Sequence, residues 1–102
     1  MKIIAVTSCA TGIAHTYMAA EALSRAGKAA GHEVIVETQG AGGYKPLAQD
    51  VIDSADVVIF ANDVGIRDSD RFANAKVLQT IPKTAIKDAA KLIEDAVALA
   101  AK

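Results

Sequence analysis

The sequence is poor in the residues that usually bind metals, form cross-links or build aromatic cores. Its 102 residues include one cysteine, Cys9, two histidines and no tryptophan, and aromatic residues make up only 4% of the chain. A single cysteine excludes an internal disulfide, a CxxC redox pair and a cysteine-rich zinc site within this sequence. We therefore expect no metal and no cofactor, and any chemistry of Cys9 is that of a solitary nucleophile.

The sequence also lacks an excess of charge and a long hydrophobic run. Its 11 basic and 12 acidic residues give a formal net charge of -1, and the lysines are spread along the chain. Nucleic acids and anionic membranes are bound by clustered positive charge, which is missing here. The N-terminal apolar run has about four residues, far short of the ~20 that span a membrane. We expect a cytoplasmic protein that binds no nucleic acid.

Small aliphatic residues are what the sequence has in abundance. Hydrophobic residues make up 52% of the chain, which has the size of one domain, so we expect residues 1–102 to form a single domain. Short β-branched runs alternate with helical patterns, which predicts parallel strands in an open sheet with helices on both faces, a Rossmann- or flavodoxin-like α/β fold. Strands are predicted at 2–6, 34–36, 57–61 and 77–78, and helices at 14–30 and 84–101, with short helices after Pro46 and within 64–75.

The most informative stretch lies where the first apolar run ends and the first helical pattern begins, and it reads Thr7-Ser8-Cys9-Ala10-Thr11-Gly12-Ile13-Ala14-His15-Thr16. Cys9 is therefore predicted on a strand-to-helix turn. Free backbone N–H groups and the positive end of the helix dipole stabilise an anion or a thiolate there. Thr11 and Thr16 add hydroxyl donors, and Gly12 allows a tight backbone turn. The alternative, that Cys9 is a small buried hydrophobe, is disfavoured by its position beyond the apolar run.

Two further segments follow predicted strands. The glycine-rich segment 37–43, which contains Gln39 and Gly40, is predicted to form a loop after the second strand. It does not match a dinucleotide-binding fingerprint, because Lys45 stands where a third glycine belongs and the loop does not follow the first strand. Asp63 follows the third strand, on the ligand side of a parallel sheet, and is either an acid or a turn-forming residue.

The stretch around Cys9 resembles a known active-site segment. Residues 9–16, followed by Met18-Ala19-Ala20-Glu21-Ala22-Leu23, are similar to the active-site segment of the fructose-type IIB components of the phosphoenolpyruvate-dependent sugar phosphotransferase system. Later matches fall in the order of that family, so the resemblance covers about residues 2–78. They are Glu37-Thr38-Gln39-Gly40, Ala55-Asp56 before Val57-Val58-Ile59, Asp63 and Arg71-Phe72. Ala10 departs from the proline that is common after the cysteine, which removes a rigid φ but no reactive group.

The resemblance implies a phosphoryl carrier. Cys9 would take a phosphoryl group from a phosphohistidine of a IIA protein or domain and pass it, from phosphocysteine, to a sugar bound by a membrane IIC partner. The sugar implied is fructose or a fructose-like sugar, and the carrier would be cytoplasmic beside IIC. The backbone of residues 10–15 would hold the phosphoryl oxygens, and the loop with Gln39 and Gly40 would meet the sugar or the partner. The implied strand order, 2-1-3-4, places a switch point beside Cys9.

Two other classes of function remain open from the residues. Cys9 and His15 have the spacing C-x5-H, one residue type away from the C-x5-R loop of the low-molecular-weight cysteine phosphatases and arsenate reductases. Arginine in that loop clamps phosphate with two hydrogen bonds and a permanent charge, whereas His15 offers at most one titratable donor. The second alternative is a flavodoxin-like binding module in which Cys9 does not react.

Overall fold

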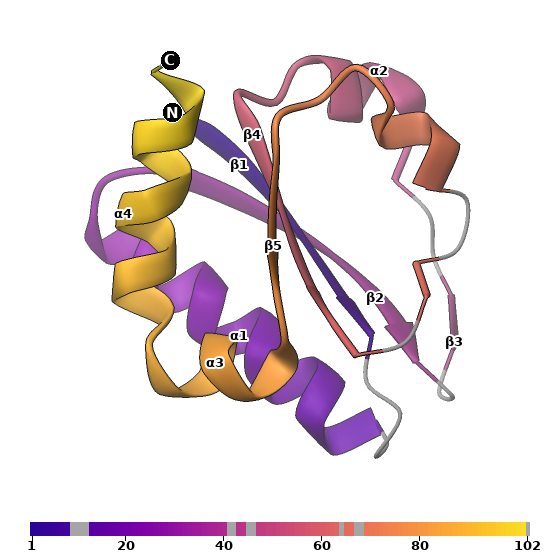
Figure 1. Cartoon of the computed structure of the whole chain (residues 1–102), viewed down its shortest axis with the longest axis vertical. Helices are drawn as coiled ribbons and strands as arrows, with labels where there is room; N and C mark the ends of the chain where they lie inside the picture. The colour runs from indigo at the N-terminus through magenta and orange to yellow at the C-terminus, as the bar shows by residue number, and fades with distance from the viewer. Residues whose placement is uncertain (9–12, 41–42, 45–46, 64, 67–68, 102) are drawn as a thin grey trace.

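A five-stranded sheet, formed by the described residues, is the centre of the computed structural model (Figure 1). The structure describes residues 1–8, 13–40, 43–44, 47–63, 65–66 and 69–101. Strands β1 (Lys2–Ser8), β2 (Glu33–Gly40), β4 (Val57–Asn62) and β5 (Val77–Thr80) are parallel, in the order β2-β1-β4-β5. The short β3 (Gly43–Tyr44) pairs antiparallel with the end of β2.

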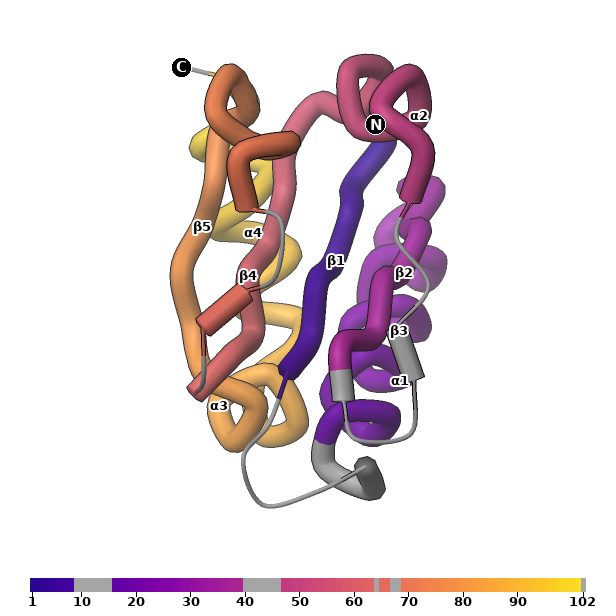
Figure 2. Tube along the Cα trace, turned by 90° about the vertical axis from the view of Figure 1, so that its right-hand side faces the viewer, coloured from indigo at the N-terminus to yellow at the C-terminus, as the bar shows by residue number. Residues whose placement is uncertain are grey.

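β1 is the central strand, and its sequence explains why. Figure 2 shows it between β2 and β4, and Ile4 lies opposite both Ile35 and Val58. Every residue from Ile3 to Ser8 is buried, as expected of a parallel strand that is covered on both faces. The continuous apolar run therefore places β1 at the middle of the sheet.

Helices cover both faces of the sheet (Figure 1). One face carries α1 (Ile13–Ala29), α3 (Pro82–Lys87) and α4 (Ala89–Ala100), and the other carries α2 (Gln49–Asp53) and the 3-10 helix η1 (Ser69–Phe72). The first core contains Ile3, Leu23, Ile59 and Ile93, and the second contains Ile4, Val6, Ile52, Val58 and Phe72. Among the described helices, none combines the length and the apolar character that crossing a bilayer requires.

Two glycines determine how α1 ends and how closely it packs on β2. Gly31 has a φ of 87°, a conformation that glycine adopts without strain, and the next N–H, of His32, donates to the carbonyl of Gly27. A Cβ atom on Gly27 would overlap Cγ2 of Val34, so the missing side chain allows α1 to approach the strand. The helix consequently packs on the sheet with its first turn at the end where β1 stops.

The N-terminus and the end of α4 lie at the same, opposite end of the sheet (Figure 1), although Figure 2 shows them apart across its width. The Nζ of Lys76, just before β5, donates to the carbonyl of Ala100 at 3.0 Å, and the backbone N–H of Lys2 donates to Asp56 at 2.7 Å. Both ends of the described chain are thus held at the amino ends of the parallel strands.

The fold class predicted from the sequence and the strand order implied by the family resemblance are confirmed, with β2, β1, β4 and β5 in the order 2-1-3-4. Other details were wrong. β1 extends to Ser8, and β2 extends to Gly40, so residues 37–40 are strand and not loop. The pairing of polar residues in these strands, together with β3, was missed because the prediction ended each strand with its apolar run. The C-terminal helix is divided at Asp88, whose φ of -129° and ψ of 43° are not helical.

Candidate functional site

The residues proposed around Cys9 lie at the edge of the sheet where β1 ends and α1 begins. Ser8 is the last residue of β1 and Ile13 is the first residue of α1. Cys9, Ala10, Thr11 and Gly12 lie between them and are outside the described residues, so the anion cradle stays a prediction. The backbone of Ile13, Ala14 and His15 forms the first turn of α1, and Thr16 follows in the same helix with only 1% of its surface exposed.

Ser8, the residue before Cys9, is held from both sides. Its Oγ donates a hydrogen bond of 2.6 Å to the carbonyl of Gln39 in β2. Its own carbonyl accepts a hydrogen bond of 3.1 Å from the N–H of Asp63, which follows β4. Because Ser8 is also 4% exposed, the end of β1 has little freedom, and the chain enters the Cys9 segment from a fixed position.

Glu37 is the centre of a buried polar network next to this end of β1. Both of its carboxylate oxygens accept hydrogen bonds from Arg71, from Nη1 and Nη2 at 2.8 Å each. The Leu47 N–H donates to Oε1 at 2.7 Å, and Gln39 Nε2 donates to Oε2 at 2.6 Å. The Glu37 side chain is fully buried, and that of Arg71 is 16% exposed. Four donors therefore surround a carboxylate that has no access to water.

The charge state of Glu37 follows from these contacts. Burial alone raises the pKa of its carboxyl group, because a low dielectric disfavours the charged form. The hydrogen bonds from Arg71, from the Leu47 N–H and from Gln39, together with the positive charge of Arg71, outweigh burial and lower the pKa below its ordinary value of 4.5. Glu37 is thus an ionised partner of Arg71 at neutral pH, not a proton donor.

The structure places the remaining predicted residues in two different settings. Gln39, expected in a loop, is instead a strand residue that is 2% exposed, and Gly40 ends β2 opposite Gly43 of β3. Gln39 belongs to the strand because its side chain lies on the same face of β2 as that of Glu37 and donates a hydrogen bond to it. Asp63 lies just past β4, as predicted; it is exposed, and its N–H donates to the carbonyl of Ser8.

Sequence reasoning missed the roles of Ser8 and Arg71. The predicted first strand ended at residue 6, before Ser8, and Arg71 was given no role beyond its part in the family resemblance. The available signal was the alternation of Glu37 and Gln39 after a β-branched run, which has the period of a strand with a polar face. A buried acid on such a face requires a positive partner, but the sequence does not tell which arginine supplies it.

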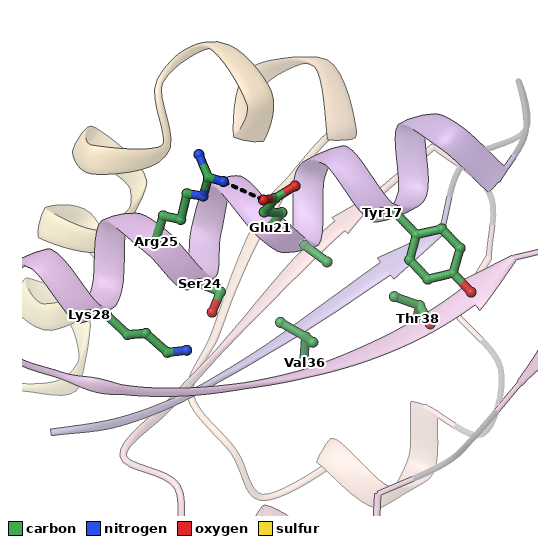
Figure 3. A pocket seen from close by; sticks show the side chains of 8 residues that line it. Tyr17, Glu21, Ser24, Arg25, Lys28, Val36 and Thr38 are labelled. Carbon is green, nitrogen blue, oxygen red and sulfur yellow. Dashed lines mark ion pairs between the residues drawn. The ribbon is translucent and has the colours of Figure 1, made fainter.

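A groove of about 570 Å³ runs along the flank of α1, over β2 (Figure 3). Val36 and Thr38 of β2 line one side, and Tyr17 and Lys28 of α1 line the other. Tyr17, which is 51% exposed, lies in the second turn of the helix, so the groove reaches toward the Cys9 side of the molecule. The Glu21–Arg25 ion pair in Figure 3 is exposed and contributes little to stability.

Comparisons with known proteins agree on one family. The family model "PTS system, Lactose/Cellobiose specific IIB subunit" matches residues 4–95. The chain is 53% identical over 91 residues to the PTS system fructose-like EIIB component 2 of Escherichia coli K12, covering 88% of this chain and 82% of that protein. It is 46% identical over 99 residues to the PTS system fructose-specific EIIB'BC component of Rhodobacter capsulatus, covering 96% of this chain but only 17% of that protein.

A solved structure shows the same relationship. The solution structure of the Enzyme IIB subunit of a PTS system from Escherichia coli K12 superposes with a TM-score of 0.90 at 40% sequence identity. The alignment covers 98% of this chain and 94% of the other. The likeness therefore extends over the whole sheet and its helices, including the edge where β1 ends.

Proposed function

The chain belongs to the family of PTS IIB components, and on this premise we propose that it is a phosphoryl carrier with Cys9 as the residue that carries the phosphoryl group. The observation that supports Cys9 most directly is its position. The sole thiol of the sequence lies in a four-residue connection between the central strand and the 17-residue helix α1. The N–H groups and the dipole of such a helix start stabilise a thiolate and the oxygens of a bound phosphoryl group.

Transfer through Cys9 takes two displacements at phosphorus. In the first, the Cys9 Sγ forms a bond to the phosphorus of a phosphohistidine on IIA, the P–N bond breaks, and the imidazole leaves and takes up a proton. In the second, a sugar hydroxyl oxygen forms the new bond to phosphorus, the S–P bond breaks, and the thiolate is restored while the hydroxyl gives up its proton. The backbone from Ala10 to His15 and the Thr11 and Thr16 hydroxyls would hold the phosphoryl oxygens in both steps.

The proposed partners follow from the relatives. The Rhodobacter capsulatus protein carries B and C components in its name, which supports a membrane IIC partner for this chain, and the family resemblance supports IIA as the donor. The names of both curated relatives support fructose or a fructose-like sugar as the acceptor. We place the chain on the cytoplasmic side of the membrane, where it meets IIC.

The phosphatase alternative requires an arginine that clamps the phosphate. His15 occupies the corresponding sequence position, and Arg71 has both Nη atoms bonded to Glu37 with only 16% of its side chain exposed. A guanidinium engaged in this way is poorly placed to clamp a phosphate in two-point contact. The arrangement therefore favours a carrier, which must protect its phosphocysteine from water, over a hydrolase.

The decisive experiment is phosphorylation of the intact chain by phosphorylated IIA, followed by intact mass measurement. The wild-type chain should gain one phosphoryl group, and Cys9→Ser should gain none while keeping the same circular dichroism spectrum. Lys91→Met, which removes an exposed charge in α4, serves as the matched control and should be phosphorylated as fast as the wild type. Phosphorylation of Cys9→Ser with wild-type kinetics would show that another residue is the acceptor.

A further inference from the structure

A continuous row of polar contacts connects Arg71 to the residue before Cys9. Arg71, in η1, binds Glu37 through two hydrogen bonds of 2.8 Å. Glu37 in turn accepts a hydrogen bond from the side chain of Gln39, and the carbonyl of Gln39 accepts one from Ser8 Oγ, both at 2.6 Å. Each link is short, and Glu37, Gln39 and Ser8 are all at most 4% exposed. The row thus runs through the interior, from η1 to the end of β1.

A buried row of this kind is not required for stability alone. A buried ion pair has to recover the large cost of removing two charges from water, and apolar residues of similar size often serve stability equally well. Here the cost is met by four donors to Glu37, which fix the carboxylate in position. Such a completely hydrogen-bonded group holds its neighbours in one arrangement, which is what a site for group transfer requires.

Three segments meet at the Glu37–Arg71 pair. The Leu47 N–H donates to Glu37, and the Leu47 carbonyl accepts from Arg71 Nη1 at 3.3 Å, so the segment before α2 is bound to both partners. Arg71 brings in the segment between β4 and β5, and its guanidinium also lies over the Phe72 ring, 5.0 Å from the centroid. Ser8 is bonded to the ends of β2 and β4. The pair therefore fixes the surroundings of the Cys9 segment without belonging to it.

We propose that Arg71 is a positioning residue for phosphoryl transfer, acting through Glu37 and Gln39 on Ser8 and hence on Cys9. This inference rests on the proposed function of Cys9. In this role Arg71 acts through the hydrogen bonds of Glu37 and Gln39. It keeps the end of β1 at the point from which Cys9 reaches phosphorus in line with the leaving imidazole. A displacement of about 1 Å at such a point lowers the rate of transfer by up to ~100-fold.

A double-mutant cycle between Arg71 and Ser8 tests this inference. The single-turnover rate constant for phosphorylation by phosphorylated IIA is measured for the wild type, Arg71→Lys, Ser8→Ala and the double variant. Each single variant should lower the limiting rate about 10-fold, with little change in the IIA concentration that gives half of that rate. The double variant should be no slower than the slower single variant, because both changes interrupt the same row.

Lys91→Met provides the control for the cycle, because it removes a positive charge from an ion pair that is exposed and remote from the row. It should leave the rate unchanged alone and should not alter the effect of Ser8→Ala. If the losses of Arg71→Lys and Ser8→Ala multiply, the two residues act independently and the inference is overturned. Glu37→Gln is a second variant in case Arg71→Lys does not fold, and a wild-type rate in a folded Glu37→Gln chain would also overturn it.

Alkylation of Cys9 by iodoacetamide separates this inference from the proposed function. If the wild-type chain gains no phosphoryl group from IIA, the proposed function fails whatever Arg71 does. The alkylation rate constant of Cys9 is then measured at several pH values for the same four proteins of the cycle, and this measurement needs no partner protein. Coupled changes in Arg71→Lys and Ser8→Ala would retain the positioning role, and independent or absent changes would reject it.

Discussion

Glu37 and Arg71 are joined by two parallel hydrogen bonds of 2.8 Å although 34 residues separate them in the sequence. The pair connects the strand beside β1 to the segment that follows β4, and it lies almost entirely out of water. Two-point contact of this kind has strict geometric requirements, so lysine cannot reproduce it. Replacing Glu37 and replacing Arg71 should therefore each have its own effect on the free energy of unfolding, and the two effects can be measured separately.

The stability of the protein should depend on the ionisation of Glu37. Its folded-state pKa is lowered, so Glu37 contributes stability that is fully present above the unfolded value near 4.5 and is lost as the pH falls through the folded pKa. Urea unfolding between pH 7 and pH 3 should show the difference between wild type and Glu37→Gln shrinking below about pH 4.5. A difference that stays constant over this range would mean that the Glu37 pKa is the same in both states.

Removal of Arg71 should be much more costly than removal of an exposed lysine. Arg71→Met leaves the Glu37 carboxylate buried without its positive partner, which should lower the free energy of unfolding by about 3–5 kcal/mol. Lys91→Met breaks a pair whose side chains are 69% and 44% exposed, and it should cost less than ~0.5 kcal/mol. Urea denaturation at pH 7 measures both, and equal losses would contradict the assignment of Arg71 to the interior.

Gly27→Ala should destabilise the protein although alanine favours a helix. The added methyl group would overlap Val34 Cγ2, and overpacking of this kind costs about 1–3 kcal/mol against a gain of ~1 kcal/mol in helix propensity. Val34→Ala removes the overlap, so Gly27→Ala should cause no loss in a Val34→Ala background. Thermal unfolding of the four proteins tests this, and a higher midpoint for Gly27→Ala alone would show that the helix can move away from the strand.

The isolated chain should hydrolyse phosphate esters poorly. A hydrolase needs an arginine for the transition state and an acid for the leaving group, whereas this chain has His15 at the arginine position. Turnover of p-nitrophenyl phosphate should stay close to that of a Cys9→Ala control and well below ~1 s⁻¹. Rapid, repeated turnover that disappears in Cys9→Ala would identify a phosphatase and reject the carrier.

The sequence was sufficient for the fold class because the alternation of strands and helices depends on local patterns, whereas the strand order came from the family resemblance. Ile3 to Val6 predicted a buried strand, and the small apolar residues after Cys9 predicted the long helix that follows it. It was insufficient at the ends of β1 and β2, where Ser8 and Gln39 are polar and yet buried. Whether such a residue pairs inside the sheet or lies in a loop depends on partners that are distant in the chain, and a single sequence does not specify them.

In the candidate site, too, local features could be predicted from the sequence and contacts between distant residues could not. A thiol before a glycine and a helix is a local pattern, and it predicted a nucleophile at Cys9, whereas its role in phosphoryl transfer came from the family resemblance. The support given to this segment by Arg71 is not local, because Glu37 could only be paired with a specific arginine once the segment between β4 and β5 was placed. Sequence reasoning therefore reached the proposed reactive group and missed the residues that hold its neighbour, Ser8.

The N-terminus and the end of α4 both lie at the amino ends of the strands, and this has a consequence for tethering (Figure 1). A flexible linker attached at either end departs from the side of the sheet opposite to Ser8, so it leaves the proposed reactive edge uncovered. In the proposed carrier, such a tether would let the chain present the same edge to a donor and to an acceptor in turn. A short tether also raises the effective concentration of a partner on the same chain without requiring a permanent interface.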